Sequence, residues 1–236
     1  MVTVLPLRLI GATLARRGRT LVGPIDLTLA AGGTTVVIGP NGSGKTSLLR
    51  LMHGLQRTAA GRVEWALPDA SARMRQSYVF QQPVALRRSV LENLAFPLRL
   101  RGVPRAQARA AAEDAARRVG LDDRLSQSAP SLSGGEMQRL ALARALITDP
   151  EILFADEPCA ALDGAATRRI EGMLLSAAAT TRIVMATHDM GQARRLAREV
   201  IFLLHGRIHE SGPADAFFDA PRTLEARAFL NGDILE

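Results

Sequence analysis

The sequence predicts an α/β fold, because short apolar runs typical of buried strands alternate with longer segments that have helical spacing. The clearest runs are 36–38, 152–155 and 183–186, and each ends in a glycine-rich or polar segment. In open α/β sheets, ligands bind at the carboxyl ends of the strands. The 236 residues, of which 47% are hydrophobic, suffice for the core of one large domain. We therefore expect a single α/β domain with a ligand site at one edge of its sheet.

The segment that follows the run 36–38 has the spacing G-x-x-x-x-G-K-T, known as the P-loop. Backbone N–H groups of such a loop form a nest for anions, and its lysine reaches the β and γ phosphates of a nucleoside triphosphate. Lys45 is the only lysine among thirty Lys and Arg residues, which indicates that a compact ammonium is needed here. We expect a helix over 45–55 and nucleotide contacts from Gly39, Pro40, Asn41, Gly42, Ser43, Gly44, Lys45, Thr46 and Ser47.

The middle of the chain begins with two short strand-like runs, at 60–65 and 77–80, and continues in segments of helical spacing. The helical segments are 91–100, 105–119 and 136–146. No strand signal occurs between 84 and 135. We therefore expect an all-helical insertion in the α/β core over about 84–135.

Polar side chains follow the two later strands of the predicted sheet. Asp156 and Glu157 follow the run 152–155, and His188 follows 183–186. Because the P-loop also follows a strand, all three groups are expected at one sheet edge. Adjacent residues of a strand point in opposite directions, so the two acids are expected to have different tasks.

A second phosphate site is predicted where the helix over 136–146 begins. Ser133, Gly134 and Gly135 precede this helix, whose first N–H groups lack partners within the helix. The free N–H groups and the positive helix end favour an anion.

Composition restricts the class of protein. The net charge of +7 is spread along the chain and aromatic residues make up 4%, so a stacking platform for nucleic acid is not expected. The single cysteine, Cys159, cannot form an intrachain disulfide. No apolar run approaches the roughly 18 to 20 residues of a membrane helix. We expect a soluble or peripheral protein of the cytoplasm.

Five motifs together resemble the ATP-binding subunits of ABC transporters. They are, in the order of that family, the P-loop at 39–46, Phe80-Gln81, Leu-Ser-Gly-Gly-Glu at 132–136, Ala-Asp-Glu-Pro at 155–158 with Ala-Leu-Asp at 161–163, and Thr-His-Asp at 187–189. The resemblance covers nearly the whole chain. It implies a P-loop NTPase (RecA-like) core with an N-terminal antiparallel β subdomain and an all-helical insertion. The single domain 1–236 would then divide into a core of about 1–83 and 136–236 and a helical subdomain of about 84–135.

The resemblance also implies a role for each site residue. Thr46, Gln81 and Asp156 would hold Mg²⁺, with Gln82 as the rival of Gln81. Glu157 would act as the general base for water, and His188 would contact the γ phosphate. Gln81 would also be catalytic, as a contact to water that senses the state of the nucleotide. His53, His205 and His209 lack such a context and are expected to be structural.

In the family, the second phosphate site of one subunit covers the nucleotide on another. Function would then require a head-to-tail homodimer with two Mg-ATP at its interface. The residues expected to act in trans are Ser133, Gly134, Gly135 and Asp163.

The adenine contact departs from the family pattern. The family usually stacks adenine on an aromatic residue before the P-loop, but no Phe, Tyr or Trp precedes Trp65. Arg17 falls near the expected place, and a guanidinium can stack on a base. We expect Arg17 to contact adenine, with Arg16 and Arg19 as rivals.

By resemblance, the chain would drive integral-membrane permease subunits at the cytoplasmic face of the bacterial inner membrane. The permease would dock at about 83–93, where Leu86 is expected either in this surface or in the core. The short ending after 217–221 and 228–230 resembles oxyanion importers, of the tungstate, molybdate and phosphate kind, which also use a solute-binding protein. The alternatives are an exporter or lipoprotein-release ATPase and, least favoured, a soluble ABC ATPase acting on DNA or ribosomes.

Overall fold

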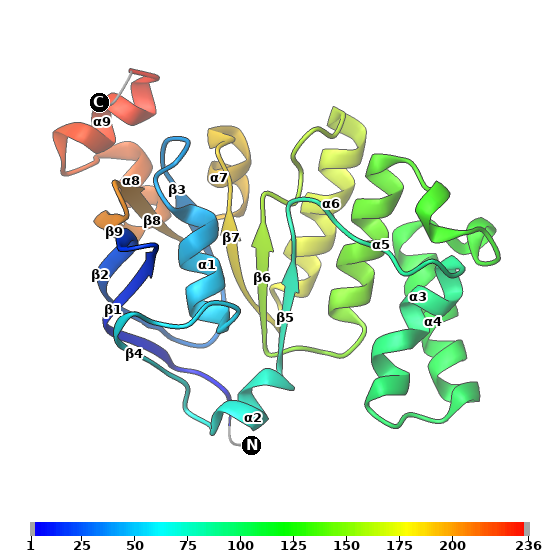
Figure 1. Ribbon diagram of the computed structural model, residues 1–236. Coiled ribbons are helices and arrows are strands. Elements are labelled where there is room, and N and C mark those ends of the chain that lie inside the picture. The colour runs from blue at the N-terminus through cyan, green and yellow to red at the C-terminus, as the bar shows by residue number, and fades with distance from the viewer. Residues whose placement is uncertain (1–2, 234–236) are drawn as a thin grey trace.

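The computed structural model describes residues 3–233 and contains a six-stranded sheet at its centre (Figure 1). The ends of the predicted domain 1–236 lie outside the described residues. The strand order is β5-β6-β7-β3-β8-β9, in which the first five strands are parallel and β9 is antiparallel to β8. The strands are β3 (Thr34–Ile38), β5 (Gln76–Val79), β6 (Ile152–Asp156), β7 (Arg182–Ala186), β8 (Glu199–Leu204) and β9 (Arg207–Pro213).

The three strands that precede the candidate site residues are the neighbours β3, β7 and β6. Every residue of these strands is buried, as expected for a parallel sheet covered on both faces. Ala186 of β7 pairs with Val37 on one side and with Asp156 on the other. The prediction that these strand ends meet at one sheet edge is confirmed.

A second sheet forms the predicted N-terminal antiparallel subdomain. Its order is β2-β1-β4, with β1 (Leu7–Arg16), β2 (Arg19–Leu29) and β4 (Ala60–Glu64). Helix α1 (Lys45–His53) packs between the two sheets. The core at this place joins Leu9, Leu48 and Phe154, one from each layer.

Helices cover the opposite face of the large sheet. They are α5 (Gly134–Leu146), α6 (Gly164–Ala177), α7 (Met190–Leu196), α8 (Ala214–Asp219) and α9 (Leu224–Asn231). A second core forms there between the strands and side chains such as Leu142, Ile170 and Leu196. Among residues 3–233, no helix has both the length and the apolar character needed to cross a bilayer.

The stretch 84–135 is helical, with α3 (Val90–Leu100), α4 (Arg105–Val119) and two short 3₁₀ turns. Ala108, Ala112 and Ala116 recur every fourth residue of α4, and this face packs against α3 and α5 in a third core. The extended pairing found there is a single bridge between Ser89 and Ser128. In Figure 1 these helices lie beyond β5, at one end of the molecule.

Several predicted bounds shift for local reasons. Helix α1 ends at His53 instead of residue 55, because Gly54 adopts the left-handed conformation (φ 82°) and donates its N–H to the Leu51 carbonyl. Helix α5 begins at Gly134 instead of residue 136, because Ser133 caps it. The five-residue helix α2 (Asp69–Arg73) was not predicted.

Candidate functional site

The P-loop has a backbone that requires glycine at both of its ends. Gly39 has φ 151°, and a Cβ there would lie 2.1 Å from the Leu203 carbonyl oxygen. Gly44 has φ 103° and precedes α1, and a Cβ there would lie 2.8 Å from Val22 Cγ2. Helix α1 has no side-chain cap and no acid in its first turn. Its first N–H groups and its positive end are therefore left for an anionic ligand.

The ammonium of Lys45 lies inside this loop. Its Nζ donates to the carbonyl oxygens of Gly39 at 2.9 Å and Pro40 at 3.1 Å, and the residue is 7% exposed. Burial lowers the pKa of Lys45, and the nearby charges of Glu157 and Asp156 partly oppose this. The positive charge is therefore held at the loop without a direct carboxylate partner in residues 3–233.

Ser43 adds an observation that fits a phosphate ligand. It is 3% exposed, and its hydroxyl has no hydrogen-bond partner among the described residues. A buried hydroxyl without a partner costs about 1–3 kcal/mol, so such groups usually serve a ligand or ordered water. The residues of the loop thus fit the polyphosphate of a nucleotide.

Asp156 is fully buried between two hydroxyl groups. Its Oδ1 accepts from Thr46 Oγ1 at 2.8 Å, and its Oδ2 accepts from the Tyr78 phenol at 3.2 Å. Thr46 and Asp156, predicted as ligands of one metal, are therefore brought together from α1 and β6. Carboxylate and hydroxyl oxygens are hard ligands of the kind that Mg²⁺ prefers.

Tyr78 is a partner of Asp156 that the sequence analysis missed. Burial and the charge of Asp156 raise the pKa of its phenol, which therefore stays a neutral hydrogen-bond donor. The signal for finding it is strand register, because Tyr78 pairs with Phe154, two residues before Asp156. Residues two apart share a face of a sheet.

Glu157 contacts His188 instead of Thr46. Its Oε2 lies 2.5 Å from His188 Nδ1, and the His188 side chain is 61% exposed while that of Glu157 is 10% exposed. Glu157 has φ 49°, one residue past the end of β6, and its N–H donates to the Ala186 carbonyl. The two acids have different partners, as expected, but the cause is this turn and not strand alternation. A non-glycine residue in the left-handed region is strained, which is typical of functional sites.

Gln81 lies exposed, two residues after β5, which is the neighbour of β6 in the sheet. No hydrogen bond joins it to Thr46 or Asp156 in the described part of the chain.

The segment after Gln81 is nevertheless fixed. The buried amide of Asn93 donates to the carbonyls of Leu86, Arg88 and Ser89 and accepts the Leu86 N–H. Arg144 of α5 donates to the Val84 carbonyl at 2.6 Å. Leu86, expected either in the docking surface or in the core, is half-buried.

The start of α5 is closed by its own side chains. Ser133 donates from N and from Oγ to Glu136 Oε2, at 2.8 Å each, and its Oγ accepts the Glu136 N–H. This is a capping box. Asp163 caps α6 in a related way, by accepting the Ala166 N–H at 2.7 Å. A Cβ on Gly135 would lie 3.4 Å from Ala166 Cβ, so the residues predicted to act in trans lie close together.

These residues lie apart from the P-loop within the chain. In Figure 1, β7, β6 and β5 lie between α1 and α5, although both helices begin at the end of the sheet where the strands finish.

Arg17 lies in a tight turn beside the P-loop. Arg17 and Gly18 link β1 to β2 with φ angles of 51° and 76°, the signs of a type I′ turn. The side chains of Arg16, Arg17, Arg19 and Leu21 line a shallow pocket. The Leu21 carbonyl oxygen lies 3.1 Å from a Cβ placed on Gly44, so this pocket adjoins the start of α1.

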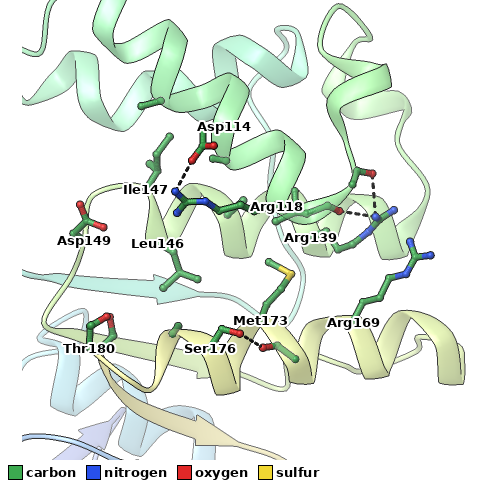
Figure 2. A pocket seen from close by; sticks show the side chains of 18 residues that line it. Asp114, Arg118, Arg139, Leu146, Ile147, Asp149, Arg169, Met173, Ser176 and Thr180 are labelled. Atoms are coloured by element: carbon green, nitrogen blue, oxygen red, sulfur yellow. Dashed lines mark hydrogen bonds and ion pairs between the residues drawn. The ribbon is translucent and has the colours of Figure 1, made fainter.

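A wider groove lies between α4, α5 and α6 (Figure 2). Two of its three arginines are engaged, because Arg118 pairs with Asp114 and Arg139 donates to the carbonyls of Val119 and Gly120. None of the predicted site residues lines it. The groove is the junction of the helical stretch with the core.

A family model described as ABC transporter matches residues 22–160, which is more than half of the chain. The chain belongs to the ABC transporter family. Members that serve as ATP-binding subunits hydrolyse ATP, and this chain is such an ATPase.

Relatives with similar sequences are import proteins. A tungstate uptake system ATP-binding protein, TupC, of Peptoclostridium acidaminophilum is 40% identical over 204 residues, which cover 85% of this chain and 94% of the relative. A probable anion import ATP-binding protein of Haloferax volcanii is 38% identical and covers 89% of this chain and 81% of the relative. A phosphate import ATP-binding protein, PstB 2, of Natronomonas pharaonis is 36% identical and covers 95% and 90%.

A solved structure has the same fold. It is cbiO1 from Clostridium perfringens, part of the ABC transporter complex cbiONQ, with a TM-score of 0.81, 23% identity and 94% coverage of both chains. The predicted fold class is confirmed.

Proposed function

We propose that this chain is the Mg²⁺-dependent ATPase subunit of an importer for an oxyanion such as tungstate. The observation that carries the ATPase part is the sheet edge where Lys45, the Thr46–Asp156 pair and the Glu157–His188 pair meet. Support for the solute comes from the relatives, which are named as tungstate, anion and phosphate import proteins.

The P-loop would hold the phosphates of ATP. The first N–H groups of α1, the free Ser43 hydroxyl and the Lys45 ammonium all suit an anion, and the ammonium is not neutralised by a direct carboxylate contact in the described residues. Arg17 would stack on adenine from the turn that borders the loop.

Thr46 and Asp156 would hold Mg²⁺, with Gln81 as a further ligand from the neighbouring strand end. When bound, Mg²⁺ supplies charge neutralisation on the phosphate oxygens. Tyr78 would keep the Asp156 carboxylate oriented by its hydrogen bond.

Glu157 would accept the proton of the attacking water, as a general base. The Glu157 side chain is almost buried, and its Oε2 contacts Nδ1 of His188, whose side chain is exposed. Positioned proton transfer of this kind contributes about 10²–10⁴-fold to a rate. His188 would also turn its remaining ring nitrogen toward the γ phosphate and stabilise its charge.

Two chains would form the working unit. Ser133, Gly134, Gly135 and Asp163 lie together at the same end of the sheet as the P-loop but apart from it, which suits a head-to-tail homodimer with two ATP. Permease subunits would dock at about 83–93, where Val84 is 73% exposed and Arg87 and Arg88 are exposed, on the cytoplasmic face of the membrane. A solute-binding protein would deliver the anion through the permease.

The test is uptake in cells. A strain that carries Glu157→Gln is compared with the parent and with Glu64→Gln, a control at a half-buried glutamate of β4. Cells are exposed briefly to tungstate, molybdate or phosphate, and tungsten, molybdenum and phosphorus are measured by elemental mass spectrometry. We expect Glu157→Gln alone to lose uptake of one anion. Unchanged uptake of all three, with the variant inactive as an ATPase in vitro, would contradict the oxyanion proposal.

A further inference from the structure

An ion pair with no part in the proposed chemistry joins α6 to α7, and its carboxylate is buried while the arginine side chain is 53% exposed. Glu171 of α6 is 6% exposed, and its carboxylate receives two hydrogen bonds from Arg195 of α7, Nε to Oε2 at 2.9 Å and Nη2 to Oε1 at 2.7 Å. The amide of Gln192, which is 1% exposed, lies 3.5 Å from Oε1. A bidentate arginine contact of this kind fixes both distance and orientation.

Both helices follow the loops that carry Glu157 and His188. Helix α7 begins at Met190, two residues after His188, and its cap Asp189 accepts the N–H of Gln192 at 2.9 Å. Helix α6 begins at Gly164, after the turn that starts at Glu157. The Gln192 side chain also lies close to the thiol of Cys159, two residues beyond Glu157. One side chain of α7 thus contacts both α6 and the loop of Glu157.

Helix α7 needs such an anchor. It has seven residues, and helices this short are unstable unless tertiary contacts hold them. An ion pair with one exposed partner adds little net stability, because water screens the attraction, but a bidentate contact fixes the orientation of the two side chains. The contact of His188 with Glu157 at 2.5 Å depends on the arrangement of both loops.

We infer that the Glu171–Arg195 pair is a positioning device, which holds α7 against α6 and thereby keeps His188 at Glu157. The inference rests on the proposed role of Glu157 and His188 in ATP hydrolysis. Among the described residues, neither Glu171 nor Arg195 hydrogen-bonds a residue that is proposed to bind the nucleotide. A displacement of about 1 Å at a reacting group costs up to about a hundredfold in rate, so loss of the pair should lower kcat and leave the KM for ATP unchanged.

The test uses the full chain with Mg-ATP and four variants. Arg195→Leu leaves Glu171 without its arginine partner, and the double variant Glu171→Leu/Arg195→Leu removes both charges. Arg195→Lys keeps the positive charge but cannot make the bidentate contact. The control is Arg194→Leu on the same helix, where Arg194 lies over the Phe218 ring at 4.6 Å, away from Glu171. We expect kcat to fall at least about tenfold in the first two variants. Arg195→Lys should have a kcat between those of Arg195→Leu and the parent, and Arg194→Leu should keep the parental kcat even if its Tm falls.

Cys159 provides a second readout, because it is the only cysteine of the chain. Burial raises its pKa to about 11, so the parent should react slowly with iodoacetamide at pH 8. We expect several-fold faster alkylation in Arg195→Leu and in the double variant than in Arg194→Leu. Parental kcat or parental alkylation in the double variant would overturn the inference. Equal hydrolysis by the parent and Glu157→Gln would refute the proposed function instead, and alkylation would still report on the Glu171–Arg195 pair.

Discussion

The starts of α1 and α5 are two helix ends predicted to bind phosphate, and they are built in opposite ways. Helix α1 follows Gly44, has no side-chain cap and no acid in its first turn, and carries the buried Lys45. Helix α5 follows Ser133, which forms a capping box with Glu136, and this end is exposed. The first end is open and positive, whereas the second is closed by its own acid.

The difference indicates two separate tasks. Hydrogen bonds from the Ser133 backbone and hydroxyl lower the pKa of Glu136, which therefore stays ionised over the start of α5. An acid at this place offsets the positive helix end. In one chain, therefore, the start of α1 is prepared for an anion, whereas we propose that the start of α5 meets a phosphate that another chain already holds.

The largest expected effect is at the open end. Lys45→Arg keeps the charge, but a guanidinium does not fit where Nζ contacts the Gly39 and Pro40 carbonyls. We expect kcat/KM for ATP to fall on the order of a hundredfold, as in Lys45→Ala. Steady-state hydrolysis checks this, and a Lys45→Arg variant with parental kcat/KM would show that the loop needs only a positive charge.

The C-terminal end of α1 carries a histidine, His53, which makes stability depend on pH. Burial, and to a smaller extent the charge of Arg73, lowers the pKa of His53 to about 4, where it lies between the Tyr78 and Phe154 rings. Since unfolded His has a pKa of about 6.5, the unfolded chain binds more protons below that pH. The contribution of neutral His53 to stability is complete above about pH 6.5 and is lost as the pH falls toward 4.

The variant His53→Leu removes this titration. Between pH 7.5 and pH 5, we expect the free energy of unfolding to fall by about 2 kcal/mol more in the parent than in the variant. Urea unfolding at the two pH values measures it, and each protein serves as its own reference. Equal losses would mean that His53 is not buried in its neutral form.

The closed end is tested by Ser133→Ala. This variant loses a helix cap worth about 1 kcal/mol and the hydroxyl proposed to reach the partner's nucleotide. We expect about a tenfold lower kcat with unchanged affinity for a fluorescent ATP analogue, because the P-loop is intact. Thr223→Ala, which removes the cap of α9 far from the site, is the matched control and should keep the parental kcat. A kcat reduced equally by both variants would assign Ser133 to stability alone.

The smallest effect concerns the pocket beside the open end. Arg17→Ala should raise the KM for ATP several-fold with little change in kcat, since stacking on adenine is the same in the ground and transition states. Arg62→Ala, an exposed arginine of β4, should change neither. If the KM rises for Arg16→Ala or Arg19→Ala and not for Arg17→Ala, the contact belongs to that neighbour.

Residues that follow buried strands were predictable, because a parallel sheet brings strand ends together whatever the loops do. Lys45, Asp156 and His188 are such residues, and strand register confirms their common edge. The conformation of Glu157 was not predictable from strand alternation, since it depends on a left-handed turn one residue past β6.

Contacts between distant segments were also missed. Tyr78 reaches Asp156, and Arg195 reaches Glu171, through the order of strands and the packing of helices. Asn93 and Arg144 hold the segment after Gln81 by bonds to backbone carbonyls, which any sequence in that segment would offer. Such contacts leave no spacing pattern in the sequence.

The central claim is that the open end of one chain meets the closed end of another around ATP. The most direct test is the mass in solution of Glu157→Gln, which should bind ATP without hydrolysing it, measured by light scattering with and without Mg-ATP. We predict the mass of two chains with Mg-ATP and of one chain without it, and the mass of one chain in both conditions when Ser133→Arg is added. The mass of one chain for Glu157→Gln with ATP bound would contradict the account.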